Sequence, residues 1–115
     1  MALIEIWHNP RCSKSRQTLA LLEERDLEVK VRRYLEDAPD VAELRNALAL
    51  LDIPAKDLIR RGESRFKELG LPLDSPEETL LAAMAAHPIL IERPIVFARE
   101  KAAIGRPPEA VLDIL

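Results

Sequence analysis

The pattern of apolar and polar residues predicts a strand, a helix and a second strand at the start of the chain. Leu3–Trp7 is an apolar-rich segment of strand length, and Asn9-Pro10 after it is a turn signal. Residues 15–25 contain no helix breaker and predict a helix whose first turn includes Ser13–Ser15. Glu28–Arg32 alternates strictly in polarity, which predicts a strand with one buried face. This order predicts a parallel crossover.

The middle of the chain carries helical periodicity. Apolar residues recur at spacings of three and four over residues 41–51, and Asp40 with Glu43 forms a capping-box pattern at the start of this segment. Pro54–Gly62 predicts a short helix that its proline opens and its glycine ends. Ser75–Pro88 predicts a further helix, with a serine cap, a proline in the first turn and a His-Pro stop.

The last part of the chain predicts a hairpin and a final helix. Pro94–Ala98 is rich in β-formers, and Lys101–Ile104 can pair with it across Arg99-Glu100. Pro107-Pro108 opens a helix with three apolar residues on one side: Val111, Leu112 and Leu115. The whole order predicts one α/β domain over residues 1–115, with about four strands in a mixed sheet and a helical insertion.

Charge and composition narrow the functional classes. The 115 residues include 17 Lys and Arg against 20 Asp and Glu, which gives a net charge of −3. This mild acidity, without a block of basic residues, argues against nucleic acids and membrane surfaces as partners. An anion site in this chain must therefore be local. We expect a monomer.

The cysteine count and the N-terminus indicate the compartment. We expect no signal peptide, because the chain runs from Met1 directly into the first strand, and no apolar run has membrane-spanning length. Cys12 is the single cysteine, so one chain can form neither an internal disulfide nor a thiolate metal cluster. The two histidines and one cysteine do not have metal-site spacing. We expect a reducing cytoplasm.

Cys12 is the candidate reactive group. It falls at the predicted strand-to-helix junction, where unpaired backbone N–H groups and the helix dipole lower a thiol pKa. The segment His8–Arg16 adds three cations and two hydroxyl groups, and the same N–H groups can cradle an oxyanion. A buried structural cysteine is the alternative, which this polar, cationic neighbourhood disfavours.

Two common thiol chemistries do not fit the spacing. A cysteine phosphatase needs an arginine six residues after its cysteine, but Thr18 stands there and Arg16 comes only four residues on. The fourth position of a Cys-x-x-Cys motif is Ser15, so Cys12 has no resolving partner. Any redox turnover must borrow a second thiol from outside, such as glutathione or a glutaredoxin.

Three arginines beside element ends are candidate oxyanion ligands: Arg60, Arg93 and Arg106. The planar fork of arginine donors suits oxyanions, although a solvated surface charge is the alternative for each. His8 next to the cysteine loop either supports the thiolate, by a hydrogen bond or a positive charge, or caps the turn. These alternatives stay open at this point.

Five separated motifs together resemble the glutaredoxin-coupled arsenate reductase family, above all its short members with a Cys-Ser-Lys-Ser loop. The resemblance covers nearly the whole chain. The motifs are His8–Arg16, Tyr34-Leu35-Glu36, Leu58-Ile59-Arg60, His87–Val96 and Gly105-Arg106-Pro107-Pro108.

The resemblance implies a fold, a reaction and residue roles. It implies a single thioredoxin-like arsenate reductase domain over residues 1–115, with Cys12 as the nucleophile and a cis peptide at Arg93-Pro94. Arsenate is held by the three candidate arginines, and the thiolate is supported by the residues that match the family's loop, which are His8, Ser15 and Arg16.

The implied reaction reduces arsenate to arsenite through a thiol-arsenate adduct on Cys12, with glutathione as co-substrate, glutaredoxin as partner and no bound cofactor. This chain has Ser13-Lys14 where the best-known members have Gly-Thr. Two alternatives without arsenate turnover are therefore kept. One is a redox regulator of the same fold, which Ser15 disfavours, and the other is a monothiol exchange protein, which the three arginines disfavour.

Overall fold

A computed structural model of the chain describes residues 3–25, 27–72 and 74–115. The chain divides into two compact units. The first contains the residues up to Asp37 together with Arg93–Leu115, and the second contains Ala38–Glu92. The expectation of a single domain stays a prediction.

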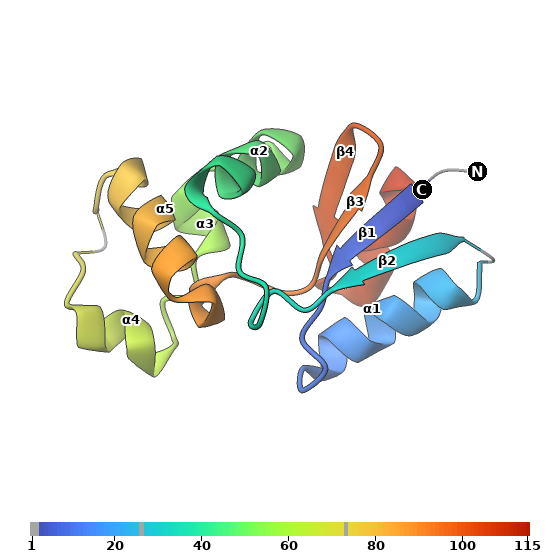
Figure 1. The fold of residues 1–115 in the computed structure, drawn as a ribbon, viewed down its shortest axis with the longest axis horizontal. Coiled ribbons are helices and arrows are strands. Elements are labelled where there is room, and N and C mark those ends of the chain that lie inside the picture. The colour runs from blue at the N-terminus through green and yellow to red at the C-terminus, as the bar shows by residue number, and fades with distance from the viewer. Residues whose placement is uncertain (1–2, 26, 73) are drawn as a thin grey trace. The chain divides into compact units, whose positions relative to one another are not determined.

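The first unit is built on a four-stranded mixed sheet with the order β2-β1-β3-β4 (Figure 1). Strand β1 (Leu3–Trp7) pairs in parallel with β2 (Glu28–Arg32) and antiparallel with β3 (Ile95–Ala98). Strand β4 (Lys101–Ile104) completes the hairpin with β3. The predicted parallel crossover, hairpin and mixed sheet are confirmed.

Helix α1 (Ser13–Glu23) and the 3-10 helix η2 (Pro108–Ile114) pack on each other and on one face of this sheet (Figure 1). The core between them is made of buried apolar side chains from β1, α1, β3 and η2: Ile4, Ile6, Leu22, Val96, Ala98 and Val111. Because strand side chains alternate between faces, Trp7 and Phe97 lie on the opposite face, with ring centroids 4.9 Å apart.

Two predictions about the first unit are partly wrong. Val29 packs against the core, but Val31 on the same face is 44% exposed, because β2 lies at the edge of the sheet. The final helix is a 3-10 helix, in which Val111 is buried and Leu115 is 42% exposed. A 3-10 helix has three residues per turn, so apolar residues at α-helical spacing do not stay on one face.

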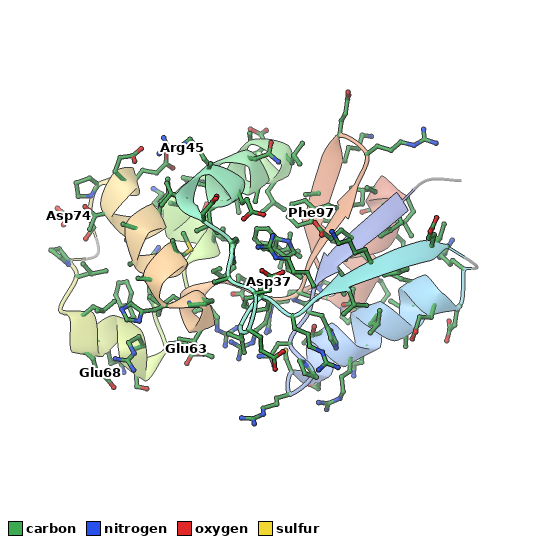
Figure 2. The ribbon with its side chains drawn as sticks, viewed as in Figure 1. Asp37, Arg45, Glu63, Glu68, Asp74 and Phe97 are labelled. Atoms are coloured by element: carbon green, nitrogen blue, oxygen red, sulfur yellow. The ribbon has the colours of Figure 1, made fainter. Side chains whose placement is uncertain are left out.

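The second unit is helical. It contains α2 (Val41–Leu51), α3 (Ala55–Leu58), α4 (Ser64–Leu69), α5 (Glu77–Ala86) and the 3-10 helix η1 (Pro88–Leu90). Buried side chains of α2 and α5 face each other in its core: Leu44, Ala47 and Leu48 with Leu80, Leu81 and Met84. Arg45, labelled in Figure 2, lies on α2. Its guanidinium donates two hydrogen bonds of 2.8 Å to Glu78 of α5 and so links the same two helices at the surface.

The predicted start of α2, the opening of α3 at Pro54 and the stop of α5 at His87-Pro88 are right, whereas the end of α3 and the cap of α5 are wrong. Asp40 and Glu43 form the expected reciprocal capping box. Helix α3 ends before the extended Ile59, well ahead of Gly62, because Ile59 forms an isolated β-bridge with Ile91. Ser75 does not cap α5, since its hydroxyl donates to Pro72 O at 2.6 Å. Helix α4 lies in a stretch where no helix was predicted.

None of the helices in the described ranges is long and apolar enough to cross a bilayer.

Candidate active site

In the first unit, the end of β1, the start of β3 and the end of β4 lie side by side at one edge of the sheet. Trp7 at the end of β1 pairs with Ile95 at the start of β3, and Ile95 pairs with Ile104 at the end of β4. The loop that follows β1, the segment that precedes β3 and the segment that follows β4 therefore start from one edge of the sheet. These three segments carry Cys12, Arg93 and Arg106.

The loop after β1 is shaped by a buried asparagine. The side-chain oxygen of Asn9 accepts a hydrogen bond from the backbone N–H of Arg11 at 3.0 Å. Its backbone oxygen accepts one from the N–H of Cys12, also at 3.0 Å. Such turns are typical of asparagine, whose side chain bonds to the backbone two residues on. They place Cys12 as the N-cap residue of α1, with extended backbone angles. The predicted junction is confirmed.

The sulfur of Cys12 lies at a helix N-terminus and beside two arginines. The backbone N–H groups of Ser15 and Lys14 and the side chain of Arg93 favour its charged form. Arg106 Nη2 donates to the same sulfur at 3.8 Å. Burial alone raises the pKa of the Cys12 thiol, but these donors and the positive charge of Arg93 together hold it below its ordinary value of 9.0. The site therefore favours the thiolate.

The two arginines are fixed to each other by the backbone. Arg106 Nε donates to the backbone oxygen of Arg93 at 2.8 Å, and the N–H of Gly105 donates to Pro94 O at 2.9 Å. The peptide bonds Arg93-Pro94 and Arg106-Pro107 are both cis, of which the first was expected from the family resemblance. Two predicted anion-binding residues thus lie together at the thiol.

His8 and Ser15 form a buried pair under the loop. His8 Nδ1 and Ser15 Oγ are 2.7 Å apart, and Ser15 Oγ also accepts from the N–H of Asn9 at 3.0 Å. Burial lowers the pKa of His8, as do the charges of Arg33 and Arg16, while Glu23 opposes them. The neutral form of His8 is therefore favoured, and its hydrogen bond goes to Ser15, whose own N–H faces the sulfur.

Arg16 binds the backbone of the loop that carries Cys12. Its side chain is exposed, and Nη1 donates to the backbone oxygen of Pro10 at 2.9 Å. This bond closes the loop from the helix side. The supporting role assigned to Arg16 stays a prediction.

Arg60 belongs to the second unit and is held there by two carboxylates. Its Nε donates to Glu63 Oε1 at 3.1 Å, and its Nη1 donates to Glu92 Oε1 at 2.7 Å. Backbone bonds from Arg60 N to Leu90 O at 2.6 Å and from Glu92 N to Leu58 O at 2.9 Å fix the same segments. Within the second unit, the guanidinium is thus oriented by its neighbours, and its contact with an anion stays a prediction.

Sequence reasoning missed the structural roles of Asn9 and Gly105. Asn9 was recognised only as a turn signal, although an asparagine between a strand and a reactive cysteine indicates a side chain that orders the loop. Gly105 was quoted within a motif and given no role. Its close approach to other chain segments has no signal in a single sequence.

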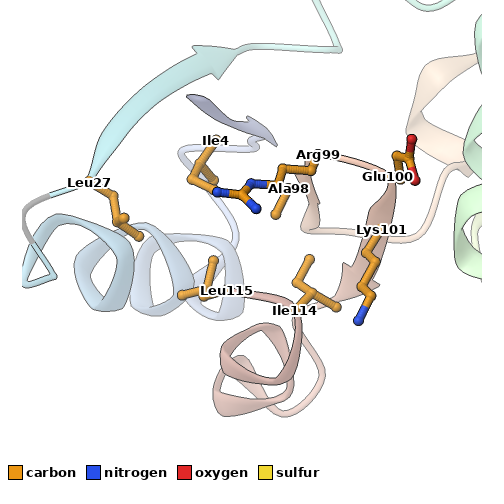
Figure 3. Close-up of a pocket in the computed structure, with 8 residues that line it drawn as sticks. All are labelled: Ile4, Leu27, Ala98, Arg99, Glu100, Lys101, Ile114 and Leu115. Atoms are coloured by element: carbon orange, nitrogen blue, oxygen red, sulfur yellow. The ribbon is translucent and has the colours of Figure 1, made fainter. Parts of the chain in front are cut away.

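The described residues also form a hollow at the other end of the sheet, with a volume of about 720 Å³ (Figure 3). Apolar side chains such as Ile4 and Ile114 line it, and the turn residues Arg99 and Glu100 together with Lys101 of β4 contribute its polar part. It lies at the start of β1, whereas Cys12 follows the end of that strand. Across the described ranges, no group of three or more His, Cys, Asp or Glu residues could hold a metal ion.

Fold and site together define a thioredoxin-like protein with one cysteine at the N-terminus of its first helix and arginines at the sulfur. More specifically, the chain belongs to the ArsC family, whose model matches residues 7–114.

Similar proteins cover the chain almost completely. An arsenate reductase of Neisseria meningitidis serogroup A is 47% identical over the full length of both chains. An uncharacterised Escherichia coli protein, YfgD, is 52% identical over 97% of this chain and 96% of its own length. A solved arsenate reductase structure from Vibrio cholerae is 46% identical, covers 99% of this chain and 98% of its own, and superposes with a TM-score of 0.95. The expected family and fold are confirmed.

Proposed function

We propose that this protein is an arsenate reductase in which Cys12 is the nucleophile. The observation that carries the proposal is the position of the Cys12 sulfur, at the N-cap of α1 and 3.8 Å from Arg106 Nη2. Arg93 and the backbone N–H groups of Ser15 and Lys14 favour its thiolate. Such a site stabilises negative charge on sulfur and on a bound oxyanion alike. The similarity to proteins named arsenate reductase over the whole chain supports the same function.

The first chemical step forms a bond between sulfur and arsenic. The Cys12 thiolate attacks arsenate, and one arsenate oxygen leaves with two protons as water, which gives a covalent thiol-arsenate adduct. Arg93 and Arg106 offset the negative charge of the oxyanion during this step. Arg60 is the third proposed anion ligand. His8, Ser15 and Arg16 support the loop that presents the thiolate.

The second step needs a thiol from outside. Reduction of arsenate to arsenite takes two electrons, and these come from joining two thiols into one disulfide. A glutathione thiolate attacks the Cys12 sulfur, the electron pair of the sulfur–arsenic bond stays on arsenic as arsenite leaves, and a disulfide between Cys12 and glutathione remains. Glutaredoxin then reduces that disulfide. No bound cofactor is required, and a lone thiol that must be kept reduced fits a cytoplasmic location. The proposed protein acts as a monomer.

A coupled assay tests the reaction. With glutathione, glutaredoxin and glutathione reductase supplied, we expect NADPH oxidation that depends on arsenate and on each thiol component. Cys12→Ser should abolish it, because serine provides no thiolate. Arsenate-independent disulfide exchange alone would instead assign the chain to monothiol exchange proteins.

The role of Arg60 can be tested by a substitution, with the same substitution at Arg61 as the matched control. Arg60→Ala should lower turnover by roughly a hundredfold, the usual loss when one charge-stabilising donor is removed. Arg61 is exposed and donates to Lys56 O, so Arg61→Ala removes the same charge one residue away. Equal activity of the two variants would show that Arg60 does not act on the substrate.

A further inference from the structure

Gly105 lies where no side chain fits. It is buried between β4 and Arg106, and a Cβ added to it would lie 2.5 Å from Thr18 Oγ1 and 2.8 Å from Pro94 Cγ. Real Cβ atoms essentially never come closer than 3.0 Å to such neighbours. Three segments of the first unit therefore meet here at a distance that only glycine allows.

Thr18 cannot easily turn away from this contact. It is fully buried in α1, and its Oγ1 donates to Lys14 O at 2.8 Å, one helical turn back. Because threonine is branched at Cβ, rotation about χ1 would put a methyl group or Oγ1 against another part of the packed interior. A larger residue at position 105 must therefore move α1 or the Pro94 segment.

These three segments are the ones that build the thiol site. Helix α1 carries Cys12 at its N-cap and provides the N–H groups that face the sulfur. The backbone of Gly105 donates to Pro94 O, directly beside Arg93, and the next residue is Arg106. Gly105 is thus a point of close contact between the helix with the thiol and the segments with the two arginines.

We propose that Gly105 and Thr18 are positioning residues, which set the distance between the first turns of α1 and the two arginine–proline segments. The missing Cβ lets these parts close to the spacing at which Arg106 Nη2 is 3.8 Å from the sulfur. The inference deepens the proposed function, since the same spacing shapes the oxyanion site. Its thiol part is independent of arsenate.

The test measures the pH dependence of Cys12 alkylation by iodoacetamide, which follows the thiolate fraction. In Gly105→Ala we expect the midpoint to rise toward that of an ordinary thiol, because α1 and the arginines move apart. Gly62→Ala is the matched control, since a Cβ at Gly62 meets no atom within 4 Å and its midpoint should stay that of the wild type.

Rescue separates positioning from general destabilisation. In Gly105→Ala/Thr18→Ala the nearest obstructing atom is gone, and we expect the midpoint to return part of the way to the wild-type value. A merely structural role for Gly105 predicts a lower melting temperature with an unchanged midpoint. That result, or a double variant shifted as far as Gly105→Ala, overturns the proposal.

A milder variant covers the case in which Gly105→Ala does not fold. Thr18→Val replaces Oγ1 with a larger methyl group at the same contact, and we expect a rise of the midpoint in the folded protein. An unchanged midpoint in Thr18→Val overturns the proposal. A wild-type protein without arsenate turnover would refute the proposed function and leave this alkylation result intact.

Discussion

At the scale of single residues, the central feature is the sulfur of Cys12, whose negative charge the surrounding groups stabilise. Burial opposes ionisation of this thiol, and the N–H groups of Ser15 and Lys14 together with Arg93 outweigh it. Of the groups that lower the thiol pKa, Arg93 can be removed by a substitution, whereas the backbone N–H groups remain in every variant.

Arg93→Ala should therefore raise the pKa of the Cys12 thiol. The variant loses both a hydrogen bond to the thiolate and a nearby positive charge. The measurement is the rate of Cys12 alkylation against pH, compared with Arg65→Ala, which removes an exposed arginine of α4. Far-UV circular dichroism confirms that both variants fold. A wild-type midpoint in Arg93→Ala would refute this assignment.

His8 makes the free energy of unfolding depend on pH, with lower stability in acid. Its pKa in the folded protein lies below the ordinary histidine value of 6.5, chiefly because of burial. The unfolded chain therefore binds more protons in acid, and the free energy of unfolding falls as the pH drops below about 6.5. Urea unfolding at pH 7.5 and pH 5.5 should show this fall in the wild type and a smaller fall in His8→Gln. An equal fall in both proteins would exclude His8 as its source.

At the scale of elements, α2 is the helix whose start is best defined by its residues. Asp40 accepts from the N–H of Glu43 at 2.8 Å, and Glu43 accepts from the N–H of Asp40 at 3.2 Å. Asp40→Ala should lower the free energy of unfolding by about 1 kcal/mol, the usual cost of losing an N-cap. Asn46→Ala, at an exposed position within α2, is the control and should not destabilise. Similar unfolding midpoints for Asp40→Ala and the wild type would contradict this role of the cap.

Sequence patterns located the elements that have strong local signals. The strands of the first unit follow from apolar-rich, β-rich or alternating segments, and the start of α2 follows from its capping box, all of which are local properties. Helix α4 was missed because it has only six residues and one buried side chain, Phe66. The one signal that could have found it is Gly70, which ends the helix in the left-handed conformation. Helix α3 was predicted too long because a distant pairing, Ile59 with Ile91, ends it.

At the scale of the whole molecule, the site depends on residues that are far apart in sequence. Cys12 was found from its own neighbourhood, whereas its contact with Arg93 and Arg106 follows from strand pairing. Local pattern could name these arginines only as candidates beside element ends, and the family resemblance assigned them to the anion site, because their contact with the sulfur depends on topology. The close packing at Gly105 was beyond sequence reasoning because it needs three segments in space.

The central claim is that Cys12 converts arsenate to arsenite, and direct measurement of arsenic species tests it. The purified protein is incubated with arsenate, glutathione and glutaredoxin, and arsenite is quantified by chromatography with elemental detection. We predict that the wild type produces arsenite with one disulfide formed per arsenite and that Cys12→Ser produces none above the protein-free background. Arsenite formed equally by both proteins, or by neither while Cys12 remains open to alkylation, would contradict the account.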